Sequence, residues 1–410
     1  MALITLTEEI FEKFADSVDR RFFEQSISMK SLLEKRGHHT DLLGLNDSSG
    51  KLQIAALIYS IPMFGGNHME VHYGPIFEDK KYLHDFLVEL RAFAKQKKVI
   101  ELEIKPYEVF QKFDDHGNAI SEENFSITDI FKKAGFKHEG LTKGYESIDW
   151  HYIKDLSQLT EKDLIKSFSK KGKPLVKKAK TFGIKIRPLK RDELHLFKDI
   201  TSSTSDRRDY NDKSLEYYEY LFDSFGEHAE FLVATLNFQE YHTNLEKDQA
   251  KLRVKLDKLE HDLEINPNSE KKQNQHKEIS SQFQTFEVRK KEAKDFIEKY
   301  QNQDVILAGS VFIFTKQELV YFFSGSYTEF NKFYAPTVLQ EYAMLEAIDR
   351  GIPRYNLLGV EGNFDGSDGV LGFKQNFNGY VERAPGKFTY YPNPIKHKSI
   401  SFVKTILGRK

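Results

Sequence analysis

Short apolar runs and one amphipathic stretch organise the first part of the chain. Residues 51–61 form an apolar run that predicts a strand, and residues 69–76 form a second, with a Gly-Gly pair between them suited to a turn. Residues 82–97 carry apolar side chains at helical spacing, and residues 99–104 alternate as a strand does. Residues 127–134 predict a shorter helix. This region therefore has a mixed α/β pattern.

The same order of elements returns later in the chain. Residues 304–315 and 319–323 predict paired strands, and residues 337–350 predict a long helix that stops before a glycine and a proline. Residues 355–358 predict the next strand. The two halves share this order with little residue identity, so we expect two similar α/β domains.

A heptad pattern separates the halves. Apolar residues recur every seven positions on both sides of a polar Asn-Pro-Asn-Ser turn: Leu245, Leu252 and Leu259 with Leu256 and Leu263, then Ile279, Phe286, Ala293 and Tyr300 with Phe283 and Ile297. This spacing predicts an antiparallel two-helix coiled coil that turns at Pro267. An arm that packs only on itself and an arm that contacts a partner both fit the pattern.

These patterns divide the chain into four parts. We expect a first domain over residues 1–150 and a second over residues 151–238 and 304–395. The helical arm takes residues 239–303, and residues 396–410 form a basic tail.

Composition excludes several classes of protein. The formal charge is -1, so a nucleic-acid site must be a local basic patch. The chain has 0 Cys, which excludes thiol nucleophiles, disulfides and cysteinyl metal sites. Its start lacks the basic and apolar regions of a signal peptide, and no run is long and apolar enough to span a bilayer. We therefore expect a soluble cytoplasmic protein.

Residues 162–180 contain eight lysines and a single Asp. Like charges at this density repel each other unless a polyanion neutralises them, although a solvated helix face also accounts for such a run. We expect Pro174 to split the run, so that it forms no continuous recognition helix. The candidate contacts to tRNA are Lys170, Lys171, Lys173, Lys177 and Lys178.

Residues 204–217 combine cations and phenols. Lys213 and Tyr217 are four positions apart, so they share a helical face and suit a diphosphate with one charge and one hydroxyl donor. Arg207 lies just before them. Surface helices commonly carry such pairs, so an unliganded surface remains an alternative.

A glycine-rich loop over residues 359–369 follows a predicted strand and leads to Phe373 and Lys374. The loop lacks the Gly-Lys-Ser/Thr ending of a Walker A motif and the spacing of a dinucleotide fingerprint. A lysine backed by an aromatic wall can hold its charge where water is excluded and stabilise a developing oxyanion. A purely conformational role for the loop fits equally well.

Two histidine-containing clusters resemble metal sites only in composition. Asp114, Asp115 and His116 precede a glycine, and His38 adjoins His39, but neither cluster has a second ligand pair at metal spacing. We interpret the first as a solvated turn and expect no metal and no cofactor. The chain also lacks a Gly-x-Ser-x-Gly nucleophile elbow. Asp365 and Asp368 are interpreted as surface-loop residues.

Several segments, in this order, resemble the Fem family of peptidoglycan bridge-forming aminoacyltransferases, closest to FemA-like and MurN-like members. The resemblance covers the whole chain and rests on these segments: residues 6–14, 73–76, 136–145, 182–187, the inserted coiled coil, 355–360 and 373–374. It implies two acetyltransferase-like (GNAT-type) domains with a helical arm. It also implies transfer of an amino acid from aminoacyl-tRNA to an amine on the stem peptide of lipid II.

The resemblance assigns roles to individual residues. The family's catalytic lysine and the phenylalanine before it fall on Lys374 and Phe373, and its phosphate-contacting residues fall on Arg207, Lys213 and Tyr217. In the first domain the family carries a lysine eight residues after a glutamine that is here Gln25. This chain has Leu33 at that position, with Lys35 and Arg36 close by as substitutes.

The resemblance also implies partners. The donated residue is expected to be alanine, with serine and glycine as alternatives, and a homo- or hetero-oligomer with related Fem proteins is possible. A lipid-linked acceptor implies peripheral contact with the inner face of the cytoplasmic membrane, for which the basic amphipathic tail suits an interfacial anchor. A short helix packed on the last domain is the alternative for that tail.

Two other functions stay open from the residues. The first is an acyl-CoA-dependent N-acyltransferase, against which the chain lacks an Arg/Gln-x-x-Gly-x-Gly/Ala pyrophosphate turn. The second is a non-catalytic tRNA-binding or coiled-coil scaffold protein that uses the arm and the lysine run.

Overall fold

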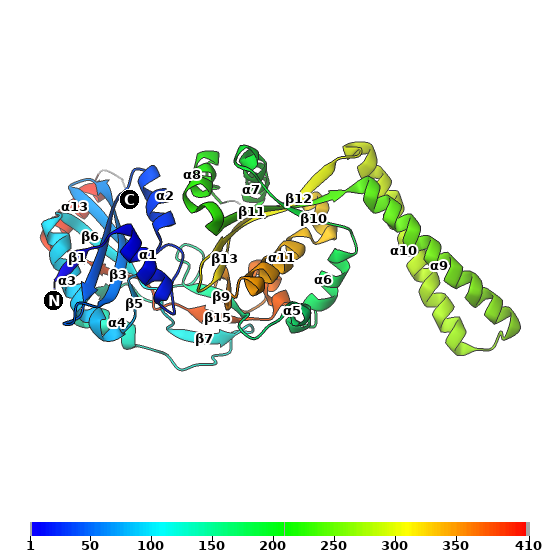
Figure 1. Cartoon of the computed structure of the whole chain (residues 1–410), viewed down its shortest axis with the longest axis horizontal. Coiled ribbons are helices and arrows are strands. Elements are labelled where there is room, and N and C mark those ends of the chain that lie inside the picture. Colours follow the sequence, from blue (N-terminus) through cyan, green and yellow to red (C-terminus); the bar gives the residue numbers. More distant parts are fainter. Residues whose placement is uncertain (1, 209, 407–410) are drawn as a thin grey trace.

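The computed structural model describes residues 2–208 and 210–406 and consists of two α/β domains from which a helical arm projects (Figure 1). The first domain is built on one sheet with the strand order β1-β2-β3-β4-β6-β16-β8, and β5 pairs with β3. Its strands are β1 (Leu3–Thr5), β2 (His39–Asn46), β3 (Leu52–Met63), β4 (Gly66–His72), β5 (Ile76–Phe77), β6 (Val99–Lys105), β8 (Lys137–His138) and β16 (Phe388–Tyr390).

Helices cover both faces of this sheet. Alternate side chains of β3 enter different cores: Ile54 and Ala56 pack with α3 and α4, whereas Ala55 and Leu57 pack toward α1 and α2. These helices are α1 (Glu8–Ser17), α2 (Ile27–Lys35), α3 (Leu83–Gln96) and α4 (Ser126–Lys133). The core beneath α1 and α2 continues into the second domain and joins the two domains.

The second sheet has the order β10-β11-β12-β13-β14-β9-β15-β7. Its strands are β7 (Gln111–Asp114), β9 (Trp150–Asp155), β10 (Lys185–Pro188), β11 (Ala229–Asn237), β12 (Asp304–Phe314), β13 (Leu319–Ser326), β14 (Arg354–Gly359) and β15 (Tyr380–Arg383). Its main helices are α5 (Glu161–Ser167), α6 (Gly172–Lys180), α7 (Leu194–Arg208), α8 (Leu215–Phe225) and α11 (Ala335–Asp349).

Strands β13 and β14 diverge. They are parallel and pair only where Leu319 lies opposite Tyr355 and Val320 opposite Asn356. Beyond these positions the strands separate, and the rest of β13 lines a cavity described below. The sheet therefore opens at the end of β14.

The two sheets exchange strands, which corrects two predicted boundaries. Strand β16 lies between β6 and β8 in the first sheet, although residues 304–395 were assigned to the second domain. Conversely, β7 pairs with β15 in the second sheet, although residues 1–150 were assigned to the first. Each strand is short and lacks a periodic pattern, so its sheet is decided by tertiary pairing.

The arm consists of α9 (Phe238–Ile265) and α10 (Glu270–Tyr300), which pack along each other and point away from both domains (Figure 1). The predicted turn near Pro267 is confirmed. At the base, Phe238 stacks on Phe296 with ring centroids 4.4 Å apart, inside the core of the second domain. The apolar heptad residues therefore hold the two helices together. The stacked pair Phe238 and Phe296 at the base attaches both helices to the second domain.

Most predicted elements have the expected bounds, with two exceptions. The strand predicted over residues 69–76 is divided into β4 and β5, because Tyr73 adopts a left-handed φ of 50° before Gly74-Pro75. The tail forms α13 (Pro394–Ile406) and packs against β6 of the first domain, not against the second. The predicted tail residues 407–410 lie outside the described residues.

Among the described residues, no helix is long and apolar enough to cross a bilayer.

Candidate functional site

Lys374 occupies a buried position at the end of a short helix, α12 (Gly369–Lys374). The carboxylate of Asp368 caps this helix by accepting hydrogen bonds from the backbone N–H groups of Val370 and Leu371. Lys374 is 3% exposed, and its Nζ donates to the carbonyl oxygens of Leu358 at 3.1 Å and Gly359 at 2.6 Å. The end of β14 thus holds the ammonium group.

The backbone at Leu358 is strained. Its φ is +60°, a left-handed conformation that a leucine rarely adopts. The side-chain oxygen of Asn356 accepts a hydrogen bond from the Leu358 N–H at 2.8 Å, and its Nδ2 donates to the Tyr107 hydroxyl at 2.9 Å. Asn356 is fully buried, so this network supports the turn whose carbonyl groups face Lys374.

Burial lowers the pKa of Lys374 to about 7, and the nearby Asp368 carboxylate only partly offsets this effect. A lysine with this pKa exchanges its proton near neutrality. A negative charge that forms beside it favours the ammonium form.

A cavity of about 450 Å³ lies in front of Lys374. Arg207, Arg208 and Phe373 also line it, together with residues 321–326 of the diverging strand β13. Its lining, as far as the chain is described, contains three cationic side chains and no carboxylate. This cavity therefore favours an anionic ligand or a transition state that gains negative charge.

Arg207 at this cavity and Asp368 at the start of α12 hold defined positions. Arg207 donates to the Thr328 hydroxyl at 2.5 Å and to the Ser326 carbonyl oxygen at 3.3 Å. Asp368 is 8% exposed and accepts a hydrogen bond from the Tyr145 hydroxyl at 2.9 Å. The interpretation of Asp368 as a surface-loop residue is therefore wrong, because it caps α12 from inside the site.

A second cavity of about 510 Å³ adjoins the first, since Tyr145, Phe322 and Phe323 line both. Its lining is acidic and contains Glu24, Glu103, Glu139, Glu146 and Asp149, against the basic residues His72, Lys105 and Lys387. One carboxylate oxygen, Glu139 Oε1, is buried without a hydrogen-bond partner within the described part of the chain. The two adjoining cavities thus have opposite charge.

A third cavity of about 170 Å³ shares Phe322 with both and lies between the domains. Arg36 from α2 and Tyr217 from α8 line it, with the Arg36 guanidinium 5.5 Å from the centre of the Tyr217 ring. Lys213 Nζ lies 5.4 Å from the same ring. The structure thus brings three of the predicted phosphate-binding residues together.

Leu33 lines the third cavity beside Arg36 and Tyr217 but offers no charge, whereas Lys35 is not part of its lining. Leu33 is 5% exposed and packs in the core between the domains. Lys35 is exposed and is one of the charges that lower the pKa of Asp223, after the hydrogen bond from Arg191. Of the two substitutes proposed for the missing lysine, only Arg36 reaches Tyr217.

The lysine run forms two helices, α5 and α6, and the break falls before Gly172 and not at Pro174. Pro174 lies in the first turn of α6, where a missing N–H costs nothing. Lys170, Lys171, Lys177 and Lys178 are exposed, and Lys173 is partly exposed. Lys178 Nζ lies 5.3 Å from the Tyr334 ring, which lines a small cavity together with Leu175 and Phe373. The exposed lysine Lys178 therefore lies near the small cavity that is lined by Phe373, the residue before Lys374.

The two histidine-containing clusters lie in a hydrogen-bonded turn and in an aromatic contact, respectively. Asp114 accepts hydrogen bonds from the backbone N–H groups of His116 and Asn118, as expected for an exposed turn. The ring of His38 packs against Tyr59 at 5.4 Å. No group of three or more His, Asp or Glu side chains with metal-site geometry occurs in residues 2–208 and 210–406.

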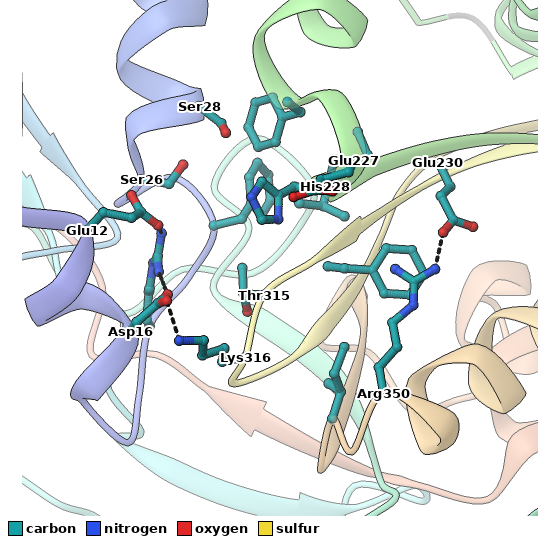
Figure 2. A pocket seen from close by; sticks show the side chains of 17 residues that line it. Glu12, Asp16, Ser26, Ser28, Glu227, His228, Glu230, Thr315, Lys316 and Arg350 are labelled. Atoms are coloured by element: carbon teal, nitrogen blue, oxygen red, sulfur yellow. Dashed lines mark hydrogen bonds and ion pairs between the residues drawn. The ribbon is translucent and has the colours of Figure 1, made fainter. Parts of the chain in front are cut away.

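A further cavity, of about 620 Å³, lies between the domains and contains none of the predicted site residues (Figure 2). Several of its charges are neutralised in pairs: Asp16 binds Lys316 at 2.6 Å, and Arg350 binds Glu230. Phe23, Phe225 and Phe314 supply apolar lining. Paired charges and an apolar wall suit a contact between domains, and we assign no ligand to this cavity.

Sequence reasoning missed several residues of the site. Arg208 follows Arg207 directly, and Tyr145 lies in one of the segments that carry the family resemblance, so both had a detectable signal. Asn356 and Glu139 also lie in such segments, but nothing local indicates their contacts, because these depend on the left-handed turn at Leu358 and on the burial of Glu139 Oε1.

The chain is similar to known proteins over its whole length. The chain is 28% identical over 419 residues to aminoacyltransferase FemA of Staphylococcus aureus strain MRSA252, with 100% of both chains covered, and the identity to FemA of strain N315 is the same. A crystal structure of FemX superimposes with a TM-score of 0.78 at 19% identity, covering 98% of this chain and 100% of that one. The superposition confirms the predicted fold class.

A family model described as the FemAB family matches residues 6–405. This match spans both domains, the arm and most of α13. The chain therefore belongs to the FemAB family.

Proposed function

We propose that this chain transfers an aminoacyl group from aminoacyl-tRNA to an amine on the stem peptide or bridge of a lipid-linked peptidoglycan precursor. The observation that carries the proposal is the buried ammonium of Lys374 in a cavity lined by cations, within a chain of the FemAB family. The similarity to FemA supports aminoacyl transfer as the reaction class. The donated residue is alanine in this proposal, with serine and glycine as alternatives.

The donor ester occupies the cavity at Lys374. Arg207 and Arg208 neutralise phosphate near the end of the RNA, and the ester carbonyl lies beside Lys374. Of the three N–H donors of the ammonium group, two are used by the carbonyl groups of Leu358 and Gly359. The third is available to the carbonyl oxygen of the ester.

The reaction then needs no covalent enzyme intermediate. The acceptor amine attacks the ester carbon, a C–N bond forms, and the carbonyl oxygen becomes an oxyanion that Lys374 stabilises. Collapse breaks the C–O bond to the ribose. The protonated acceptor first loses one proton to solvent, so that a neutral amine attacks. Of the two protons on the attacking nitrogen, one passes to the ribose oxygen and the other stays on the nitrogen of the new amide. The enzyme contributes alignment and charge stabilisation.

The acidic cavity receives the acceptor. Glu139 Oε1 offers a buried acceptor atom without a partner, and Glu146 adds a second carboxylate. These groups attract a protonated amine and orient it toward Tyr145 and Phe322, where the two cavities meet. The opposite charges of the cavities thus separate the anionic donor from the cationic acceptor.

The lysines of α6 extend the donor site. Lys177 and Lys178 lie on the exposed face of α6, and Lys178 approaches Tyr334 near Phe373. In this proposal they contact the tRNA backbone outside the catalytic cavity. The third cavity, lined by Arg36 and Tyr217, binds the diphosphate of the precursor, and Lys213 adds a charge next to the Tyr217 ring. Because the acceptor is lipid-linked, the enzyme works at the inner face of the cytoplasmic membrane.

The test is a transfer assay with radiolabelled alanyl-, seryl- and glycyl-tRNA and a lipid-linked acceptor. Transfer of label to the lipid fraction supports the proposal and identifies the donor. Binding of the tRNA without transfer would indicate a tRNA-binding scaffold instead. Absence of both, together with transfer from an acyl-CoA, would indicate an acyl-CoA-dependent enzyme.

A further inference from the structure

Large apolar side chains are exposed at one end of the first domain. Phe64, in the turn between β3 and β4, is 66% exposed, and Ile395 and Phe402 of α13 are 80% and 67% exposed. The turn and the helix are in contact, because a Cβ atom placed on Gly65 would lie 2.5 Å from Ile400 Cδ1. The turn that carries Phe64 therefore meets helix α13 at this end of the domain.

Helix α13 presents apolar residues on its outer face. Ile400 is 8% exposed and anchors the helix to the domain. Ile395 and Phe402 are seven positions apart and thus on the same side, whereas Phe402 lies about 200° around the helix from Ile400. A helix of this kind normally buries its apolar face, so an outward apolar face indicates an interaction surface.

The charge around this surface is positive. Residues 394–406 contain three lysines and a histidine but no Asp or Glu, and Lys396 and Lys398 are exposed. The carbonyl oxygen of Lys98 lies next to Gly66, which brings the exposed pair Lys97 and Lys98 to the same end of the domain. Apolar side chains flanked by lysines match the interface of an anionic bilayer.

We propose that Phe64, Ile395, Lys396, Lys398 and Phe402, here called the α13 patch, bind the surface of an anionic lipid bilayer. The proposal deepens the proposed function, on which it rests for the lipid-linked acceptor. The apolar side chains enter the boundary between headgroups and acyl chains, and the lysines contact anionic headgroups. The binding is peripheral and reversible.

Strand β4 links the α13 patch to the acceptor cavity. It starts at Gly66 beside the patch and ends at His72, which lines the acidic cavity, over about 20 Å at 3.3 Å per residue. His68 pairs with Glu101 at 3.5 Å, and the pKa of Glu101 is lowered by that hydrogen bond and also by His397 of α13. Helix α13 therefore lies on the same face of the sheet as His68 of β4 and Glu101 of β6, here called the polar row.

This arrangement gives the acceptor a direct route. With the α13 patch on the bilayer, the diphosphate that carries the lipid binds in the third cavity, and the peptide enters the acidic cavity, which shares Glu24, His72 and Phe322 with it. The row ends at the acidic cavity next to Lys374's cavity. The patch and the acceptor site therefore lie at the two ends of one path.

The experiment is sedimentation of the full chain with vesicles of phosphatidylcholine alone or mixed with phosphatidylglycerol. We expect binding to the anionic vesicles, weakened by salt, and little binding to the neutral ones. Phe64→Ser with Phe402→Ser should reduce the bound fraction at least about tenfold. The matched control is Val254→Ser with Ile265→Ser, two side chains of the arm that are 69% and 73% exposed. Equal binding by the patch and control variants would overturn the proposal.

A transfer assay separates this proposal from the proposed function. The patch variant should lose transfer to a lipid-linked acceptor in vesicles but keep transfer to a water-soluble precursor with the same peptide. Loss of transfer to both, with normal thermal unfolding, would contradict a role in bilayer binding alone. If the wild type transfers to neither acceptor, the proposed function fails, whereas vesicle binding still tests the α13 patch. A change in oligomeric mass of the patch variant by light scattering, without a change in vesicle binding, would assign the surface to a second copy.

Discussion

The ammonium nitrogen of Lys374 lies 2.6 Å from the carbonyl oxygen of Gly359, at the end of the strand that diverges from β13. Lys154 is equally buried, at 3% exposed, but its Nζ contacts the carbonyl oxygen of Asn378 and lines none of the cavities of the site. We therefore expect Lys374→Met to lower turnover about 100- to 1,000-fold, and Lys154→Met to leave it nearly unchanged. Steady-state transfer with saturating donor and acceptor checks this, with thermal unfolding of both variants as the folding control. Wild-type turnover in Lys374→Met would exclude an oxyanion role.

The pH dependence of transfer reports the proton on Lys374. Its pKa is about 7, so the ammonium form predominates below that pH and is lost above it. Lys374→Arg stays charged throughout. The ratio of wild-type to Lys374→Arg turnover should be constant below pH 7 and fall about tenfold per pH unit well above it, and the ratio cancels the ionisation of the acceptor. A ratio that rises with pH would show that the neutral amine of Lys374 acts as a base.

Asn356 positions Lys374 through the turn at Leu358. Asn356→Ala removes the acceptor for the Leu358 N–H, and we expect a loss of about 1–3 kcal/mol in unfolding free energy together with lower kcat. Asn356→Asp keeps an acceptor oxygen and should retain more activity. The diagnostic measurement is the midpoint of the pH profile, which moves only if the carbonyl groups around Lys374 move. If the midpoint of the pH profile is unchanged in Asn356→Ala, Asn356 contributes to folding stability but does not position Lys374.

A buried ion cluster joins the two domains. Glu382 of β15 binds Arg354 at 2.5 Å and Arg20 of the first domain at 2.9 Å. Burial alone would raise the pKa of Glu382, but Arg20 and Arg354 hold it well below its usual value. Its stabilisation is therefore complete above the unfolded pKa, near 4.5, and is lost as the pH falls toward the lower folded value.

Glu382→Gln should therefore destabilise the protein most at neutral pH. We expect a loss of about 3 kcal/mol or more at pH 7, because Arg20 and Arg354 lose a buried partner. The difference from wild type should shrink below about pH 4.5. Urea unfolding at pH 7 and pH 4 measures both values, and a difference that grows on acidification would contradict this account.

The outer arm should be dispensable for folding. Phe238, Tyr241 and Leu245 at its base pack in the second-domain core, whereas Leu256 lies outside the core clusters of the described residues. Replacing residues 254–282 with a short Gly-Ser linker should leave the Tm within a few degrees of wild type. A drop of more than about ten degrees would show that the outer arm supports the domains.

The sequence is most informative where a pattern repeats. The heptads between Leu245 and Tyr300 predict both the arm and its turn, because each repeat reports the same contact between two helices. Helix α11 ends one residue before its predicted limit, Arg350, as the following Gly351 and Pro353 indicate. Repetition and stop signals are local, so a single chain reveals them.

The site is less visible in the sequence because it depends on contacts between distant segments. Lys374 stands out through its Phe-Lys pair, but nothing local indicates that Leu358 adopts a positive φ to receive it. Adjacent Lys35 and Arg36 point about 100° apart around α2, and only the packing of α2 on α8 selects Arg36 for Tyr217. The three residues of β16 carry no periodicity at all.

The position of β16 has a consequence for synthesis of the protein. The first sheet receives this strand from residues 388–390, between β6 and the edge strand β8, so this end of the sheet stays incomplete until the second domain has been synthesised. A nascent chain that stalls before this point exposes the unpaired edge of β6 to other strands. The first domain consequently cannot complete its sheet on its own and depends on the last strand of the chain.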